Sequence, residues 1–479
     1  MIGWRNAGAC LIAALLGACA AGPDYKRPQV EVPPAWQLEA PWRVGTPSDT
    51  LPKGAWWQRF NDPVLNGLEE KALAGSPTLA AANARLAQAR AGLDAVGASR
   101  YPQVGLTGRD ARARISANRP LTNNIAPNFT TTQNDYILAI SASYEVDLAG
   151  RVQRSVEGAR ANAEQSAADL ENVRLVLTAD LATAYFNLRA VDIETDVLRR
   201  SIDLQRRSLE LARSRHELGA TSGLEVAQQQ ALLDNTLTQI DVLARQRGQF
   251  EHAIATLTGT PAPLFSLAPD AKLIAPPDVP LGIPSDVLER RPDVAAAERA
   301  MAAANAQIGV ASAAFYPSIS LGGLYGSESR ALGTLFTTPS IIWSLGASLL
   351  QPIFDGGRIR ANKDAAQAGY DVTVANYRRI VLTAMQEVED GITGLAALER
   401  AQAQSQLAIT SSRRVLELAT VRYEGGVASY LDVITAQQSL LTNERLTAQL
   451  QGQRLLTSVF LVKALGGGWD GTLTVGVNK

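Results

Sequence analysis

Two kinds of hydrophobic pattern alternate along this chain of 479 residues. In the stretch 136–148 every second residue is apolar, and the residues between them become more polar toward the end. A period of two is typical of a β-strand with one apolar face. The stretch 341–353 alternates in the same way, and weaker alternations begin near residues 104 and 319. We therefore expect two strands in each half, within about 102–148 and about 317–354, joined by polar loops at 118–128 and 327–339.

Long stretches without strand or loop signals follow each strand pair. No proline occurs from Arg151 to Thr260 or after Pro352, so nothing interrupts a helix there. A helix from Arg151 to Leu218 would be about 100 Å long. We expect helical hairpins at about 150–259 and about 356–466.

A heptad pattern is present in the second helix of the first predicted hairpin. Val226, Leu233 and Ile240 are spaced by seven residues, with Leu237 and Ala244 between them. This spacing predicts a coiled-coil seam.

The two hairpins share one turn motif. Residues 211–228 and 418–437 repeat Leu-Ala, Arg, Glu, Gly, Ser, Leu, an acid and Val at an offset of 207, and the stretch 76–108 recurs as 291–323. The sequence therefore predicts a duplicated unit of two strands and a helical hairpin. Glycine can end one helix and Ser or Thr can cap the next. This places the turns at Gly219, Ala220, Thr221 and Ser222, and at Gly425, Gly426, Val427, Ala428 and Ser429.

The N-terminus has the pattern of a bacterial lipoprotein signal. A charged Arg5, a short apolar run and then Leu16-Gly17-Ala18-Cys19 form a signal peptide at 1–18, with Cys19 as the residue that receives lipid. An ordinary signal peptide with a chance cysteine is the alternative. The remaining boundaries follow from proline content and the repeats: an extended arm at 19–61, a first repeat at 62–259, a Pro-rich linker at 260–284, a second repeat at 285–466 and a tail at 467–479. We expect the tryptophans of the arm (Trp36, Trp42, Trp56 and Trp57) to anchor it to the body of the protein, and the first helix of the second repeat to start near Ser285.

Strands of this length with one apolar face fit a membrane β-barrel. Four strands cannot close a barrel, because roughly eight are the smallest working number, and open edges are not tolerated in lipid. Several chains would then share one barrel, and three copies would give roughly twelve strands. A soluble four-stranded sheet is the alternative.

Composition excludes several classes of function. A net charge of −1 with 19% charged residues gives no reason to expect binding to nucleic acid. Cys10 and Cys19 are the only cysteines, and with two distant histidines there is little material for a metal site or for catalysis. Nucleophile, phosphate-loop and zinc-protease motifs are absent from the sequence. We expect no enzyme, metal or cofactor apart from covalent lipid (palmitate) on Cys19.

The chain resembles the TolC-like outer-membrane efflux factors, in the lipoprotein (NodT/OprM-like) subtype that serves tripartite RND pumps. The resemblance rests on stretches that run in the same order from the signal nearly to the C-terminus. They are Gly22-Pro-Asp-Tyr-Lys-Arg-Pro28, Trp56-Trp-Gln-Arg-Phe-Asn-Asp-Pro63, Pro284-Ser-Asp-Val-Leu-Glu-Arg-Arg-Pro-Asp293 and Gln351-Pro-Ile-Phe-Asp-Gly-Gly-Arg358.

The resemblance implies a mainly α-helical homotrimer. A twelve-stranded barrel in the outer membrane would continue into a periplasmic helical tunnel, with a collar made by the arm, linker and tail. The hairpin tips would contact a periplasmic membrane-fusion adaptor protein, which joins an inner-membrane RND transporter. Drugs, dyes or similar small molecules would pass through the channel, which itself performs no chemistry.

The resemblance also implies a gate at the second tip. Tyr423 would belong to the tip network and Asp432 to a pore-facing ring of carboxylates, with Tyr430, Leu431 and Thr435 beside it. Some relatives have a second acid where this chain has Thr435, so one ring remains. Glu225, which matches Asp432 in the first copy, would belong to a static hairpin. The simpler interpretation is that Asp432 only caps its helix.

Two other functions share these features. A lipid-anchored periplasmic coiled-coil scaffold would use the helices, but it has no need for four alternating strands. An outer-membrane channel for type I protein secretion would use both, and only the resemblance favours small-molecule efflux over it.

Overall fold

The computed structural model describes residues 21–27, 54–116, 131–272, 274–277 and 290–467. It divides into two units, which we describe separately. The strand unit contains Leu86–Ser166 and Ala297–Tyr377 together with residues 21–27. The helical unit contains Ala167–Ala296 and Arg378–Lys479, as far as they are described, and residues 54–85.

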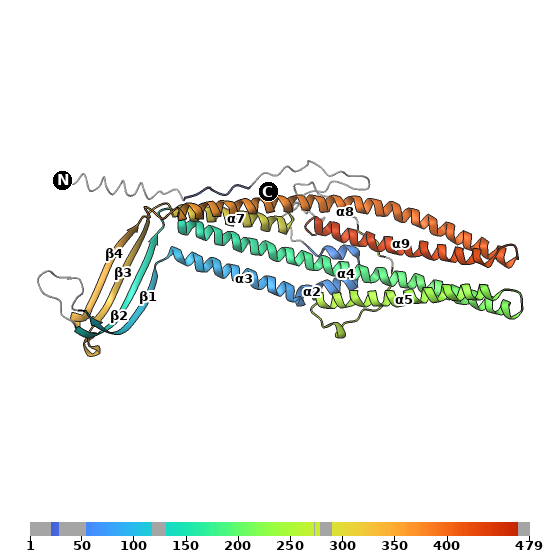
Figure 1. Cartoon of the computed structure of the whole chain (residues 1–479), viewed down its shortest axis with the longest axis horizontal. Coiled ribbons are helices and arrows are strands. Elements are labelled where there is room, and N and C mark those ends of the chain that lie inside the picture. The colour runs from blue at the N-terminus through green and yellow to red at the C-terminus, as the bar shows by residue number, and fades with distance from the viewer. Residues whose placement is uncertain (1–20, 28–53, 117–130, 273, 278–289, 468–479) are drawn as a thin grey trace, which may run out of the picture. The chain divides into compact units, whose positions relative to one another are not determined.

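The elements follow the duplicated order that the sequence predicts (Figure 1). After the helix α2 (Pro63–Gly75), the first copy contains α3 (Pro77–Gly97), β1 (Gln103–Ile115), β2 (Thr131–Val146), α4 (Arg151–Glu217) and α5 (Gly223–Leu257). The second copy contains α7 (Pro292–Ala313), β3 (Ser318–Ser329), β4 (Ile341–Leu350), α8 (Arg358–Glu424) and α9 (Tyr430–Ala464).

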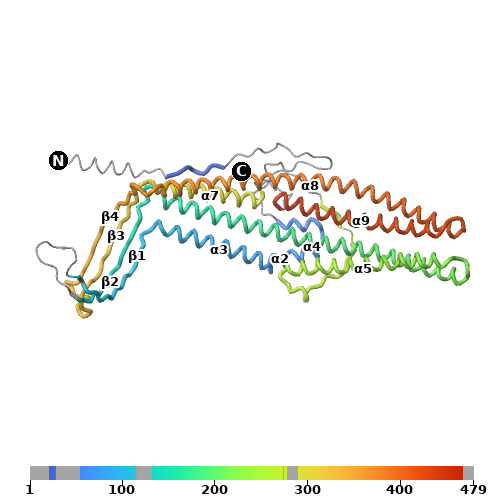
Figure 2. Tube along the Cα trace, viewed as in Figure 1, coloured from blue at the N-terminus to red at the C-terminus, as the bar shows by residue number. Residues whose placement is uncertain are grey.

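The two hairpins match residue for residue. Helices α4 and α8 each have 67 residues, and α5 and α9 each have 35. Figure 2 shows each hairpin returning along itself after a tight turn, in green for α4–α5 and in orange to red for α8–α9. The predicted duplication is confirmed for this part of the chain. The predicted loop at 118–128 and the helix start near 285 lie outside the described residues, and the loop at 327–339 begins later because β3 continues to Ser329.

The four strands form one antiparallel sheet in the order β1-β2-β3-β4. Its register brings the predicted apolar positions of all four strands to one face: Leu106 pairs with Ile140, Ile140 with Tyr325, and Tyr325 with Trp343. These side chains are exposed, Trp343 by 74% and the neighbouring Leu345 by 83%. Glycine and serine are frequent on the opposite face, where Ser141 pairs with Gly105 and Leu324 with Ser344. The sheet thus presents an apolar face with no cover from the described residues.

The two outer strands leave their far edges unpaired. Within the described residues β1 pairs only with β2, and β4 pairs only with β3. Each edge therefore exposes a row of backbone donors and acceptors that can pair with another strand.

The helical unit contains a coiled-coil seam that differs from the predicted one. Val226, Leu233 and Ile240 of α5 pack against Ile202 and Leu209 of α4, as the heptad spacing predicts. The predicted partners Leu237 and Ala244 are exposed. The positions three residues after Val226, Leu233 and Ile240 are buried instead, and they hold Gln229, Thr236 and Leu243. The two polar side chains are tolerated because Gln229 donates to the Gln205 carbonyl and Thr236 to the Leu232 carbonyl. No helix in the described part of the chain is both long and apolar enough to cross a membrane.

Helix α2 begins where the arm meets the helical unit. Asp62 caps the helix by accepting hydrogen bonds from Val64 and Leu65, with Pro63 at the first helical position. The arm residues Trp56 and Trp57 are buried, and the indole of Trp56 donates to Thr178 of α4. For these two tryptophans, the predicted anchoring of the arm is confirmed.

Helix α2 also buries an acid, Glu69, completely. Its exposure is 0%, and among the described residues neither carboxylate oxygen has a hydrogen-bond partner. Burial raises the pKa of Glu69 from 4.5 to about 9. At neutral pH the folded chain therefore holds a proton on Glu69 that the unfolded chain releases.

Replacing Glu69 should change how stability depends on pH. The protonated Glu69 carboxyl contributes to the free energy of unfolding, and this contribution is fully present below about pH 4.5. It is lost as the pH rises toward about 9, at about 1.4 kcal/mol for each pH unit. Glu69→Gln, which does not titrate, should unfold at a higher temperature than the parent at pH 8 and at a similar temperature near pH 4.5. Thermal unfolding in detergent at both pH values measures this, and Glu70→Gln, at an exposed neighbour, is the control. An unchanged pH dependence in Glu69→Gln would contradict the burial argument.

Candidate functional site

The two hairpin turns have the same backbone. Gly219 and Gly426 adopt positive φ angles of 72° and 73°, which glycine adopts without strain. In each turn the glycine amide donates three residues back, and the following amide donates five residues back, from Ala220 to Arg215 and from Val427 to Arg422. The helices end by one motif used twice.

The matching acids of the two turns do different things. Asp432 accepts a hydrogen bond from the Ser429 amide at 3.2 Å and completes a capping box at the start of α9. Glu225, with a side chain longer by one methylene, instead accepts a hydrogen bond from the Tyr423 hydroxyl at 2.8 Å. The first turn thus reaches across to the second hairpin, while Asp432 stays within its own turn and remains exposed.

Two tyrosines form a contact between the hairpins near their turns. The rings of Tyr423 and Tyr430 lie 4.9 Å apart, and the Arg215 guanidinium lies 5.0 Å from the Tyr423 ring centre. The Tyr430 hydroxyl donates to Gln229 at 3.0 Å, so each tyrosine binds a residue of α5. Burial raises the pKa of Tyr430 to about 12, and burial followed by the Glu225 hydrogen bond raises that of Tyr423. Both hydroxyls therefore remain donors throughout the neutral range.

The predicted gate residues fall into two groups. Tyr423 and Tyr430 lie in the contact between hairpins, with Tyr430 only 5% exposed. Leu431, Asp432 and Thr435 lie on an exposed face of α9. The sequence argument did not single out Arg215 or Gln229. The offset of 207 could have drawn attention to Arg215, which matches Arg422 beside Tyr423.

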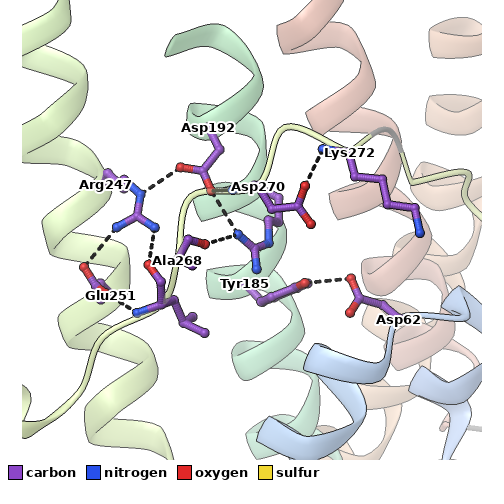
Figure 3. A network of polar contacts seen from close by, with 10 residues as sticks. Asp62, Tyr185, Asp192, Arg247, Glu251, Ala268, Asp270 and Lys272 are labelled. Carbon is purple, nitrogen blue, oxygen red and sulfur yellow. Dashed lines mark hydrogen bonds and ion pairs between the residues drawn. The ribbon is translucent and has the colours of Figure 1, made fainter. Parts of the chain in front are cut away.

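A second polar network joins the first hairpin to the linker (Figure 3). Asp192, with 3% of its side chain exposed, accepts hydrogen bonds from Arg247 of α5 at 2.7 Å, from Arg189 at 3.0 Å and from the Asp270 amide at 3.0 Å. The two arginines also donate to linker carbonyls, Arg189 to Ala268 and Arg247 to Leu267. Because every charge has a partner, the network can fix the linker to α4 and α5.

Two further contacts lie beside this network, one between α5 and the linker and one between α4 and α2. Glu251 accepts hydrogen bonds from Arg247 and from the Leu267 amide, and Tyr185 donates to the α2 cap Asp62 at 2.6 Å. The second hairpin has no such cluster at the equivalent described positions. Ala396 and Glu399 stand in place of Arg189 and Asp192, and Arg454 lies 4.0 Å from a Glu399 side chain that is 55% exposed. The copies are therefore anchored differently, since the second hairpin is instead held by the buried Arg291, which donates to Glu387 of α8 and to the Ala464 carbonyl of α9.

Some of the predicted residues lie outside the described part of the chain. Cys19, the predicted lipidation site, lies outside the described residues, as do Trp36 and Trp42 of the arm. Among the described residues, no three His, Cys, Asp or Glu side chains are grouped so that they could hold a metal ion.

Comparison with known proteins identifies the family. The family model for outer membrane efflux proteins matches residues 68–260 and 283–467. The pyoverdine export outer membrane protein OpmQ of Pseudomonas aeruginosa is 32% identical over 463 residues, which cover 96% of both chains. Outer membrane protein OprJ of the same species is 33% identical over 466 residues, which cover 96% of this chain and 95% of OprJ.

Solved structures agree with this result. The outer-membrane channel OprN superimposes with a TM-score of 0.86 at 29% identity, covering 94% of this chain and all (100%) of that chain. The MtrE channel of Neisseria gonorrhoeae, solved in its open state, gives 0.80 at 28% identity, covering 94% and 98%. The chain therefore belongs to the outer membrane efflux protein family and has the fold of its outer-membrane channels.

Proposed function

We propose that three copies of this chain form one passive channel, which conducts small organic molecules from the periplasm across the outer membrane. The carrying observation is the sheet, whose four strands align one exposed apolar face and whose two edges have no pairing partner among the described residues. Such a sheet is stable in lipid only when its edges are closed. The pairing of β4 in one copy with β1 in the next closes a barrel of roughly twelve strands.

The channel works as the outer component of a tripartite pump. The relatives support this role, since their names refer to the export of pyoverdine, antibiotics and toluene. On this proposal the turns at 219–222 and 425–429 meet a periplasmic adaptor protein, which joins an RND transporter in the inner membrane. Lipid on Cys19 adds a second attachment to the outer membrane.

The second hairpin is the moving part of the gate. The buried network around Asp192 supports this assignment, because it fixes α4 and α5 to the linker while α8 and α9 have one exposed ion pair at the matching position. The hydrogen bond between Tyr423 and Glu225 then holds the moving hairpin to the static one in the closed state.

Deleting the gene tests the function directly. The deletion should lower the inhibitory concentrations of several antibiotics, dyes or organic solvents, because their export stops at the periplasm. Broth-dilution profiling with and without a plasmid copy measures the effect. Unchanged susceptibility combined with the loss of a secreted protein would instead indicate type I secretion.

Two substitutions of Asp432 separate a carboxylate ring from a helix cap. Asp432→Ala removes both the charge and the cap, whereas Asp432→Asn removes the charge but can still accept the Ser429 hydrogen bond. If three carboxylates surround the axis, both variants should conduct more and lose block by divalent cations. Planar-bilayer recordings measure conductance and block. A normal Asp432→Asn channel beside an altered Asp432→Ala channel would assign Asp432 to the cap alone.

Tyr423→Phe should favour the open state more than Tyr430→Phe does. The first removes a hydrogen bond to a charged acid, worth about 1.5–3 kcal/mol, and the second a bond to a neutral amide, worth about 0.5–1.5 kcal/mol. Open probability in single-channel recordings should therefore rise by about tenfold or more for Tyr423→Phe.

A double-mutant cycle controls for indirect effects. In a Glu225→Gln background, the effect of Tyr423→Phe should shrink, because the charged partner is already gone. Fully additive effects would mean that the Tyr423–Glu225 contact does not hold the gate.

A further inference from the structure

The strands of the two repeats correspond residue by residue. The repeated stretch in the sequence relates β1 to β3 at an offset of 215. The pairings then relate β2 to β4: Leu106 pairs with Ile140, and its counterpart Leu321 pairs with Ala347. From Ile140 to Ala347 the offset is 207, which is also the offset between the two hairpin turns. The correspondence therefore continues from the strands into the helices.

The contact between β2 and β3 joins the last strand of one repeat to the first strand of the next. We call it the repeat junction. It begins with Tyr136 opposite Ser329 and continues in register to Val146 opposite Ile319. In a barrel made of several copies, β4 of one copy and β1 of the next would meet in the same relation, and we call that contact the copy junction. The observed repeat junction is thus a guide to the copy junction.

The two offsets transfer the observed register to the copy junction. Tyr136 corresponds to Trp343, and Ser329 corresponds to Arg114. Trp343 of one copy would therefore lie opposite Arg114 of the next. Arg114 is an even number of residues from Leu106, so it belongs to the same face of β1. The register thus keeps the apolar face of the sheet continuous from one copy to the next.

A point of close approach in the repeat junction supports this register. Gly326 pairs with Ala139, and a Cβ atom on Gly326 would lie 2.5 Å from the Ala139 Cβ and 2.3 Å from the Leu138 carbonyl oxygen. Only one of the two strands can therefore carry a side chain at this point. In the copy junction the counterparts of Ala139 and Gly326 are Gly346 and Ala111. The pair again consists of one glycine and one alanine, with the two residue types exchanged.

Gly346 has no other evident reason to be glycine. It is the only glycine of β4, and a Cβ atom built on it would meet nothing within 4 Å. Among the described residues, no contact within one copy therefore requires the missing side chain. Glycine weakens a strand interior and often marks a site where another backbone approaches closely. A close approach of β1 from the next copy explains the glycine.

We propose that β4 of one copy pairs with β1 of the next in this register, with Trp343 opposite Arg114 and with Gly346 and Ala111 at the point of close approach. The proposal rests on the channel proposed above. It identifies the partner of each open sheet edge as a second copy of this chain and specifies the pairing residue by residue.

Cysteine pairs across the copy junction test the register. Directly opposite residues have Cβ atoms about 4.5–5.5 Å apart and diagonal neighbours are further apart, whereas a disulfide needs about 3.5–4.5 Å. Two double variants are opposite in the proposed register: Ser344→Cys with Ala113→Cys, and Leu349→Cys with Gly108→Cys. They lie on the two faces of the sheet and so sample both kinds of antiparallel pair. After oxidation in outer membranes, denaturing gels without reductant should show covalent dimers and trimers of both.

Two double variants shifted by two residues are the matched controls. They combine Ser344→Cys with Ala111→Cys, and Ala347→Cys with Gly108→Cys. These diagonal pairs should give about fivefold less covalent product, or less still. The four single variants on β1 and β4 reveal any disulfide that forms through Cys19, since the sequence has no cysteine after it.

An exchange of the glycine and the alanine tests the close approach. Gly346→Ala puts a second Cβ atom at this point and should lower the fraction of trimer by about tenfold or more. Adding Ala111→Gly reproduces the arrangement of the repeat junction and should restore the trimer. Gly322→Ala is the control, because it faces the same side from β3 and its Cβ would meet nothing within 4 Å. Size-exclusion chromatography with light scattering in mild detergent measures the trimer.

The failing outcomes are distinct. More product from the shifted pairs than from the opposite pairs, or no disulfide from any pair in an intact trimer, would overturn the register. A Gly346→Ala variant that assembles normally, or that Ala111→Gly does not rescue, would overturn it as well. In each of these cases the channel would stand. A parent protein that is monomeric in membranes and in detergent would overturn the trimeric channel itself, and the register with it.

Discussion

An open apolar sheet is the constraint on which the rest of the chain depends. In the part of the chain that the structure describes, strands β1 and β4 each leave one edge unpaired, and the apolar side chains of all four strands share one exposed face. Lipid can cover such a face but cannot satisfy backbone donors and acceptors. In the channel proposed above, strands of neighbouring copies pair with these edges, and the contacts within one copy are then only part of what stabilises the sheet.

The two hairpins have equivalent backbones but different side-chain contacts. Backbone geometry at the turns is preserved, since both use a left-handed glycine and the same hydrogen bonds. The side chains differ: Glu225 binds across to Tyr423, while Asp432 caps its own helix. Asp192 is buried among arginines, while its counterpart Glu399 is largely exposed. The first hairpin is thus tied to the linker by a buried network that the second hairpin lacks at the matching positions.

Elements were predictable from sequence to the extent that they follow local periodicity. Alternating apolar residues predicted β2 and β4, and the absence of proline predicted α4 and α5 almost to their ends. The coiled-coil seam was predicted in part, because apolarity pointed to Leu237 whereas the structure buries Gln229 and Thr236. Gln229 can be buried because the Gln205 carbonyl of the facing helix α4 accepts its hydrogen bond, and Thr236 because the Leu232 carbonyl one turn back accepts its own. The pattern of apolar residues along the chain does not show the contact with α4.

The residues of the candidate site were predictable to the extent that the repeat or the family motif marked them. Tyr423 and Asp432 were found in this way, but the Asp192 network was not. Its members come from α4, α5 and the linker. In the sequence around each of them, nothing distinguishes it from an ordinary charged residue on the protein surface. Glu69 is the same case, since the sequence Glu-Glu-Lys resembles a solvated helix face.

Polar contacts determine much of the helix pairing and its register, because the helices are Ala-rich and closely packed. Gly391 of α8 meets Leu461 of α9, and Gly452 of α9 meets Ala190 of α4, so the backbones approach where a side chain would not fit. Small side chains pack closely but distinguish poorly between one register and the next. Paired charges such as Arg445 with Glu194, at 2.5 Å, do distinguish, because a shifted register would leave a partly buried charge without a partner. The buried ion pairs of the helical unit therefore determine which helix faces which.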